Sequence, residues 1–175
     1  MDFFVEQLIK EKRGIRYFLL VFGLSVAALL LITAAVLWLP LMLLAFAVVG
    51  IGYGWHWATT MLITEYEYCV TNGDIDVDRI RGRSRRLRLV SVRGDKIESL
   101  APYTAQTDLS RFDRVVRCLS GEETTRWYFT YHSKKNGHTA VVFEPDARVL
   151  HALVGGLSPL LRREVINTYE LPEEK

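Results

Sequence analysis

The chain has 175 residues, and its 22 basic and 20 acidic residues nearly cancel. The last 111 residues hold 18 basic and 17 acidic groups, which is enough chain for one small domain, and their near-neutral charge argues against a general nucleic-acid-binding domain. The two cysteines, Cys69 and Cys118, have neither metal-ligand spacing nor a disulfide pattern. We therefore expect no metal, no cofactor and no nucleic-acid partner.

Residues 1–16 combine apolar and charged side chains at helical spacing. Phe4, Val5, Leu8 and Ile9 would share one side of a helix, with the charged residues elsewhere. This pattern predicts a short amphipathic helix that lies on the cytoplasmic membrane surface and leads into the next segment.

Residues 17–64 contain no Asp, Glu, Lys or Arg. About 20 apolar residues cross a bilayer core of roughly 30 Å, and this run is about twice that length. Pro40, near its middle, lacks an N–H and disfavours helix at the residue before it. The run therefore predicts a transmembrane hairpin over residues 17–63, with helices at about 17–39 and 41–62. A cleaved signal peptide is the rival interpretation of the first helix, but its apolar part is too long and a second span follows directly.

Charge and aromatic residues orient this hairpin. Basic side chains crowd the start of the first helix, and the turn at Pro40 has none, so we expect a cytoplasmic N-terminus and, after two spans, a cytoplasmic C-terminal domain. The expected localisation is the plasma membrane, as a multi-pass protein. Aromatic residues would mark the two interfaces: Trp38 at the far one, and Tyr53, Trp55 and Trp57 at the near one.

The dipeptide Asn72-Gly73 separates two alternating runs within residues 65–80, EYEYCVT and DIDVDRI. A two-residue turn of this kind is a strong signal for a β-hairpin. The resulting register places apolar side chains on one face: Tyr66, Tyr68, Val70, Ile75 and Val77. It places five carboxylates on the other, those of Glu65, Glu67, Asp74, Asp76 and Asp78. We interpret the acidic face as solvated or as a partner for nearby arginines rather than as a cation site.

Residues 79–93 carry seven arginines and no acidic residue. Two interpretations remain open for this basic segment. Its side chains could contact anionic lipid, where each basic residue contributes about 1 kcal/mol, or they could pair with the hairpin carboxylates. The candidate lipid- or partner-binding residues are Arg81, Arg83, Arg85, Arg86 and Arg88.

The rest of the chain predicts more strands and then helix. One strand is expected to begin within residues 87–90, and further strands are expected at about 96–100, 114–119, 124–132 and 138–144. No helix is expected between these strands, so the sheet should be antiparallel. After Pro145 the apolar spacing changes to that of a helix, which Gly155-Gly156 interrupts, and Ser158-Pro159 starts a second helical piece. Residues 65–175 are thus expected to form a cytoplasmic, mainly antiparallel β domain with a C-terminal helix.

Two spans followed by EYEYCVTNGDIDVDRIRGRSRR, and later by VVFEPDARVLHALV, resemble an uncharacterised family of bacterial two-helix membrane proteins with a cytoplasmic PH-like (pleckstrin-homology-like) domain. The resemblance implies a barrel of about seven strands closed by a C-terminal helix, and no catalytic residues. The phosphoinositide mode of PH domains is not carried over, because the loop between the first two strands would be only Asn72-Gly73, flanked by acids.

The sequence bears on three functional hypotheses. The first is a membrane-anchored, non-catalytic interaction or scaffold module that presents its domain to an unidentified protein partner, and a homo-oligomer is compatible with it. The alternative is recognition of anionic lipid headgroups by the basic segment. An enzyme is not expected, because the chain lacks a nucleophile elbow, a phosphate-binding glycine loop and metal-ligand spacing, and its histidines are scattered.

Overall fold

The computed structural model describes residues 3–12, 14–38, 40–82, 84–121 and 125–173. The chain forms two compact units, each described here by itself. The hairpin unit comprises residues 12–64 and 81–85, and the domain comprises residues 1–11, 65–80 and 86–175. Each unit is therefore built from segments that are separated in the sequence.

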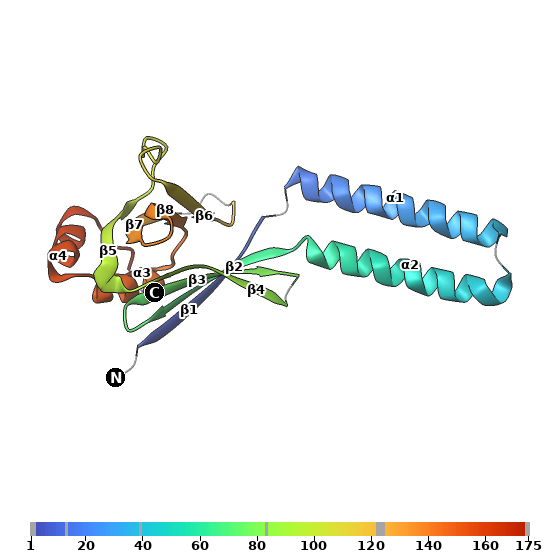
Figure 1. Cartoon of the computed structure of the whole chain (residues 1–175), viewed down its shortest axis with the longest axis horizontal. Coiled ribbons are helices and arrows are strands. Elements are labelled where there is room, and N and C mark those ends of the chain that lie inside the picture. The colour runs from blue at the N-terminus through green and yellow to red at the C-terminus, as the bar shows by residue number, and fades with distance from the viewer. Residues whose placement is uncertain (1–2, 13, 39, 83, 122–124, 174–175) are drawn as a thin grey trace. The chain divides into compact units, whose positions relative to one another are not determined.

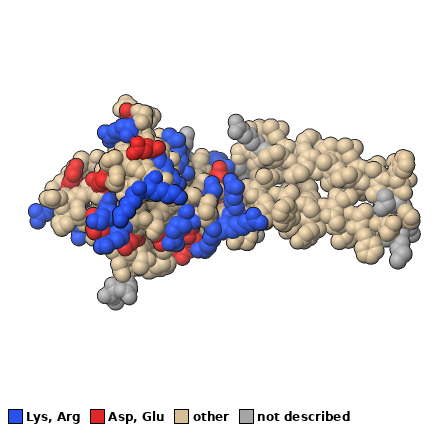
Figure 2. Space-filling view, viewed as in Figure 1, with Lys and Arg blue, Asp and Glu red and all other residues tan. Residues whose placement is uncertain are grey.

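The hairpin unit contains two helices, α1 (Ile15–Trp38) and α2 (Leu41–Met61), that lie side by side and run in opposite directions (Figure 1). Pro40 is the N-cap of α2, as its missing N–H favours, and Trp55 Nε1 donates to Ser25 Oγ at 3.2 Å across the pair. Two membrane-spanning helices were predicted, but among the described residues only one helix, Tyr17–Trp38, is long and apolar enough to cross a membrane by length and composition. The face seen in Figure 2 shows no charged side chain along the helices.

The N-terminal segment corrects one prediction. Phe4–Lys10 forms a strand, β1, and not an amphipathic helix. It pairs antiparallel with β2 (Thr64–Thr71), with Lys10 opposite Glu65. Val5 and Ile9 pack against the core, because the two-residue period of a strand places both side chains on the same face. The domain's first strand thus precedes the helices, and the hairpin is inserted between two neighbouring strands.

Two four-stranded sheets make up the domain. The first has the order β1-β2-β3-β4, with β3 at Asp74–Arg81 and β4 at Arg85–Val92. A short 3₁₀ turn, η1 (Gly94–Lys96), leads to the second sheet, whose order is β5-β7-β8-β6. Its strands are β5 (Ile97–Pro102), β6 (Arg114–Cys118), β7 (Trp127–Ser133) and β8 (Gly137–Phe143).

The second sheet differs from the antiparallel prediction at one edge. Strand β6 pairs with β8 in parallel, with Arg114 opposite Thr139. The chain reverses into β7 and reverses again through the tight Asn136-Gly137 turn, so β8 runs in the direction of β6. The described strands number eight, where about seven were expected.

The predicted β-hairpin is confirmed. Asn72 and Gly73 have φ values of 53° and 87°, as a type I′ turn requires. Tyr68, Val70, Ile75 and Val77 are completely buried, so the apolar face of the hairpin forms part of the core.

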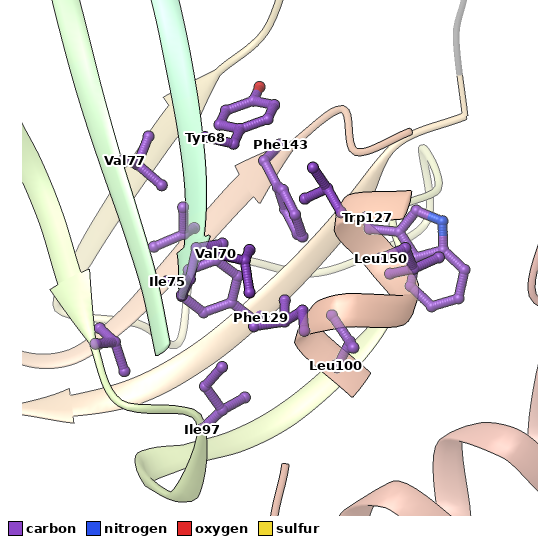
Figure 3. Packing of buried hydrophobic residues seen from close by; sticks show 14 of the residues in the cluster. Tyr68, Val70, Ile75, Val77, Ile97, Leu100, Trp127, Phe129, Phe143 and Leu150 are labelled. Carbon is purple, nitrogen blue, oxygen red and sulfur yellow. The ribbon is translucent and has the colours of Figure 1, made fainter. Parts of the chain in front are cut away.

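The core lies between the two sheets and α3 (Ala147–Gly156). Apolar side chains from both sheets and from α3 point toward one another there (Figure 3). Asp146 Oδ1 caps α3 by accepting from Val149 N–H at 2.8 Å, and Ser158 caps α4 (Pro159–Thr168). The Tyr68 hydroxyl links the sheets, because it donates to the Cys118 carbonyl oxygen and accepts from Glu144 N–H at 3.2 Å. Burial raises the pKa of Tyr68, so this hydroxyl remains a donor.

Candidate functional site

The acidic face of the β2–β3 hairpin is less solvated than its composition suggests. Glu67 is 5% exposed and Asp78 is 9% exposed. Burying a carboxylate without a partner is costly, so these groups need nearby cations.

Arg88 of β4 supplies one such cation. Its Nε and Nη2 donate to the two carboxylate oxygens of Asp78 at 2.9 and 3.3 Å, and its Nη1 lies 2.9 Å from Asp76 Oδ2. The hydrogen bond to Asp78 and the charge of Asp76 raise the pKa of Arg88. One guanidinium therefore serves two carboxylates of β3, in the bidentate geometry that favours arginine over lysine.

Arg86 pairs with Glu67 of β2. Its Nη1 lies 2.8 Å from Glu67 Oε2, and its Nη2 donates to Oε1 at 3.1 Å. Burial and a hydrogen bond that protonated Glu67 makes to Glu6 of β1 nevertheless raise the pKa of Glu67, against the opposing charge of Arg86. Two carboxyls from neighbouring strands thus meet beside one guanidinium.

Arg81 and Arg85 are placed differently. Both belong to the hairpin unit, both are exposed, and neither has an ion pair among the residues that the structure describes. The turn between them is held to the end of α2, since Gly82 N–H donates to the Ile63 carbonyl at 3.0 Å. Arg83 lies outside the described residues.

The four candidate arginines that the structure describes therefore have two different environments. Arg86 and Arg88 pair with carboxylates of β2 and β3, as the pairing interpretation anticipated. Arg81 and Arg85 remain available to an outside anion.

A recess beside β1 was missed by sequence reasoning, because that segment was predicted to be a helix. It has a volume of about 680 Å³ and lies within the domain. Its lining comes from β1, from the end of β8 and the start of α3, and from neighbouring residues: Gln7, Ile9, Lys10, Ser120, Thr125, Trp127, Glu144, Pro145, Asp146, Ala147 and Pro172. The alternation of Val5, Gln7 and Ile9 was the signal that could have revealed it.

The polar groups in the recess are mostly engaged. Glu144, 4% exposed, accepts from Ser120 N–H at 2.7 Å and from Arg126 Nε at 3.2 Å. Gln7 Nε2 donates to the Glu144 carbonyl at 3.0 Å, and Gln7 Oε1 accepts from Asp146 N–H at 2.8 Å. The recess therefore presents shape and a strand edge rather than a reactive group.

The histidines offer no metal centre in the part of the chain that is described, where no group of three or more His, Cys, Asp or Glu side chains could hold a metal ion. His132 and His138 do face each other across β7 and β8, with ring centroids 4.8 Å apart, and His138 Nδ1 lies 3.5 Å from Glu98 Oε2. All three residues are exposed. This cluster supplies neither a nucleophile nor a buried base.

Comparison with known proteins agrees with the domain architecture. No curated protein and no solved structure matches the chain. The bacterial PH-like domain family (DUF6106) matches residues 1–157, a range that runs from β1 through both helices and both sheets to α3. The strand before the helices and the sheets after them are thus covered by one match, and the chain belongs to this family of bacterial PH-like domains.

Proposed function

We propose that the chain is a membrane-anchored, non-catalytic interaction module whose helical hairpin holds the PH-like domain at the cytoplasmic face of the plasma membrane for a protein partner. The observation that carries the proposal is the pairing of β1 with β2. Strand β1 ends at Lys10 and the chain returns to the domain at Glu65, and these two residues are opposite each other in the sheet.

This pairing bears on how many times the chain crosses the membrane. Two paired strands lie on the same side of a bilayer, so the chain between them must cross it an even number of times. If α1 crosses, α2 must bring the chain back. Helix α2 has 21 residues, which corresponds to about 31 Å at 1.5 Å per residue, and it carries no charged residue. A cleaved signal would remove β1 and leave β2 as the edge of its sheet, without its β1 pairing.

Basic residues support a cytoplasmic location for the domain. Lys10, Lys12, Arg13 and Arg16 precede or begin α1, whereas residues 17–64 carry no charge. Under the positive-inside rule the N-terminal end of α1 stays in the cytoplasm. The domain, which contains both β1 and β2, stays with it.

The recess beside β1 supports a protein partner. Strand β1 is an edge of its sheet, and an extended peptide can add its backbone to such an edge while its side chains fill a neighbouring recess. Its volume of about 680 Å³ lies within the range of binding pockets.

Single-cysteine labelling on intact cells tests the topology, in a background of Cys69→Ser and Cys118→Ser. A membrane-impermeant thiol reagent should label Trp38→Cys directly, and Lys12→Cys and Arg163→Cys only after permeabilisation. Labelling of Arg163→Cys from outside would mean a single span. Loss of the N-terminal residues from the mature protein would mean a signal sequence. Either result rejects the hairpin.

Photo-crosslinking in cells tests the partner site. A crosslinkable amino acid at Lys10, in the recess, should give a discrete protein adduct, and the same amino acid at Lys134, in the β7–β8 turn, serves as the matched control. Equal adducts from both positions, or none from Lys10, would remove the recess as the partner site.

Anionic lipid is the second candidate ligand. The observation in its favour is that Arg81 and Arg85 have no ion pair within the described part of the chain.

A further inference from the structure

The hairpin unit has an unusual charge distribution. By sequence, residues 12–64 and 81–85 contain six basic residues and no acidic one. Three of the basic residues precede or begin α1, and three lie within residues 81–85, where β3 ends and β4 begins. A stretch of 48 uncharged residues, 17–64, separates the two groups in the sequence.

The fold brings the described members of both groups, Lys12 from the first and Arg81 and Arg85 from the second, to the same end of the hairpin. The antiparallel packing of α1 and α2 places the start of α1 beside the end of α2, and the bond from Trp55 to Ser25 fixes their alignment. The β3–β4 turn is held at this end by the backbone hydrogen bond that Gly82 N–H donates to the Ile63 carbonyl oxygen. The contact is close, because a Cβ at Gly82 would lie 2.9 Å from Met61 Sδ, and the φ of Gly82 is +59°. Arg81 and Arg85 are therefore anchored at the end of α2.

The described basic side chains at this end are exposed to solvent. Lys12, Arg81 and Arg85 are exposed, and the structure gives none of them a carboxylate partner among the described residues. Trp55 and Trp57 occupy the last turns of α2, and they are 38% and 53% exposed. Tryptophans in the last turns of a helix, with exposed basic side chains beyond them, are typical of a helix end at the headgroup level of a bilayer.

We propose that Lys12, Arg81 and Arg85 form a basic collar that binds anionic phospholipid headgroups around the cytoplasmic end of the hairpin. This inference rests on the proposed membrane insertion and deepens its lipid alternative. It adds Lys12 to the ligand-binding residues, and it removes Arg86 and Arg88, whose charges are already matched by Glu67, Asp76 and Asp78. Cations held near an anionic surface attract lipid charge within a Debye length, so anionic lipid should be enriched around the protein.

Tryptophan quenching in nanodiscs tests the collar with the full chain. A Trp38→Phe variant leaves Trp55 and Trp57 as the tryptophans near the collar, together with Trp127, which is 2% exposed in the domain core. Brominated phosphatidylglycerol should quench Trp55 and Trp57 several-fold more than brominated phosphatidylcholine at the same mole fraction. The preference should weaken as salt is added.

Two charge-matched variants decide the outcome. Arg81→Gln/Arg85→Gln should abolish the preference for phosphatidylglycerol, whereas Arg162→Gln/Arg163→Gln, on the exposed face of α4, should retain it. Equal quenching by the two lipids in the parent chain, or equal loss in both variants, would overturn the collar. Absence of quenching by either lipid would instead show that the hairpin is not inserted, so failure of the collar and failure of the proposed function are distinguishable.

Discussion

The domain and the hairpin unit use the same residue types in opposite ways. In the domain, Arg86 and Arg88 are bound to carboxylates of the neighbouring strands. In the hairpin unit, Arg81 and Arg85 have no such partner in the described residues, although they are neighbours of the first pair in sequence. Sequence proximity therefore does not define a functional cluster here.

Glycine shows the same contrast. A Cβ at Gly156, at the end of α3, would lie 2.2 Å from the Cα of Gly73 in the β2–β3 turn. A Cβ at Gly23, Gly50, Gly52 or Gly54 of the helices would meet no atom within 4 Å. Gly156 is thus fixed by a backbone contact inside the domain, whereas these four glycines of the helices have open space around them.

The largest expected change in the free energy of unfolding comes from a substitution at Gly156. Gly156→Ala should lower the free energy of unfolding by about 1–3 kcal/mol or more, because the methyl group meets backbone that cannot move without shifting the turn. Gly155→Ala is the matched control, since a Cβ there meets nothing within 4 Å. Urea unfolding of the full chain in detergent, followed by circular dichroism, measures both. Equal stability of the two variants would contradict the close contact.

A smaller effect is expected at the arginines. Arg86→Gln should destabilise the domain by about 1–2 kcal/mol, because it leaves Glu67 buried without its cation, and the exposure of Arg86 keeps the loss below that of a fully buried pair. Arg88→Gln should cost a similar amount, since it leaves Asp76 and Asp78 without their shared cation.

Arg81→Gln supplies the comparison for both variants. It should leave the free energy of unfolding within about 0.5 kcal/mol of the parent, as surface substitutions usually do. The same urea titration applies to all three. A destabilisation by Arg81→Gln as large as that by Arg86→Gln would erase the distinction between the two pairs of arginines.

Local sequence signals predicted the elements that depend on neighbouring residues. The φ angles at Asn72-Gly73 and the caps at Asp146 and Ser158 follow from the residue types themselves. The helix predicted over the residues of β1 was wrong. The positions of Phe4, Val5, Leu8 and Ile9 fit one face of a helix, but those of Val5, Gln7 and Ile9 fit one face of a strand equally well. Only the partner strand, more than 50 residues away in the sequence, decides between them.

For the candidate site, too, the sequence predicted the ion pairs between neighbouring strands but not the contacts between distant segments. The alternation of acids along β2 and β3 indicated partners for nearby arginines, and the structure provides them for Arg86 and Arg88. Which arginines remain without partners depends on where the β3–β4 turn meets α2, a contact between Gly82 and Ile63 that carries no local sequence signal. The parallel β6–β8 pairing was missed for the same reason, since strand order is set by distant contacts.

The pH dependence of stability gives the subtlest test of the paired region. The pKa of Glu67 is raised in the folded domain, so the folded state holds this proton more tightly than the unfolded chain does. The contribution of Glu67 to stability is therefore complete at acidic pH, and it is lost as the pH rises from the ordinary range of glutamate through the raised pKa of Glu67. The charged groups around it are Glu6 of β1, Arg86 of β4 and Asp78 of β3.

Glu67→Gln removes this proton site while keeping the side-chain volume. The difference in stability between the parent chain and Glu67→Gln should move in favour of the parent as the pH falls from neutral, because the parent gains the bound proton and the variant cannot. Urea unfolding at several pH values measures that difference. A Glu6→Gln variant should flatten the trend, since the neighbouring carboxyl contributes to the raised pKa of Glu67. A stability difference that is constant with pH, or one that moves in favour of the variant at low pH, would show that Arg86 outweighs burial at Glu67 and that this carboxylate behaves as an ordinary ion-pair partner.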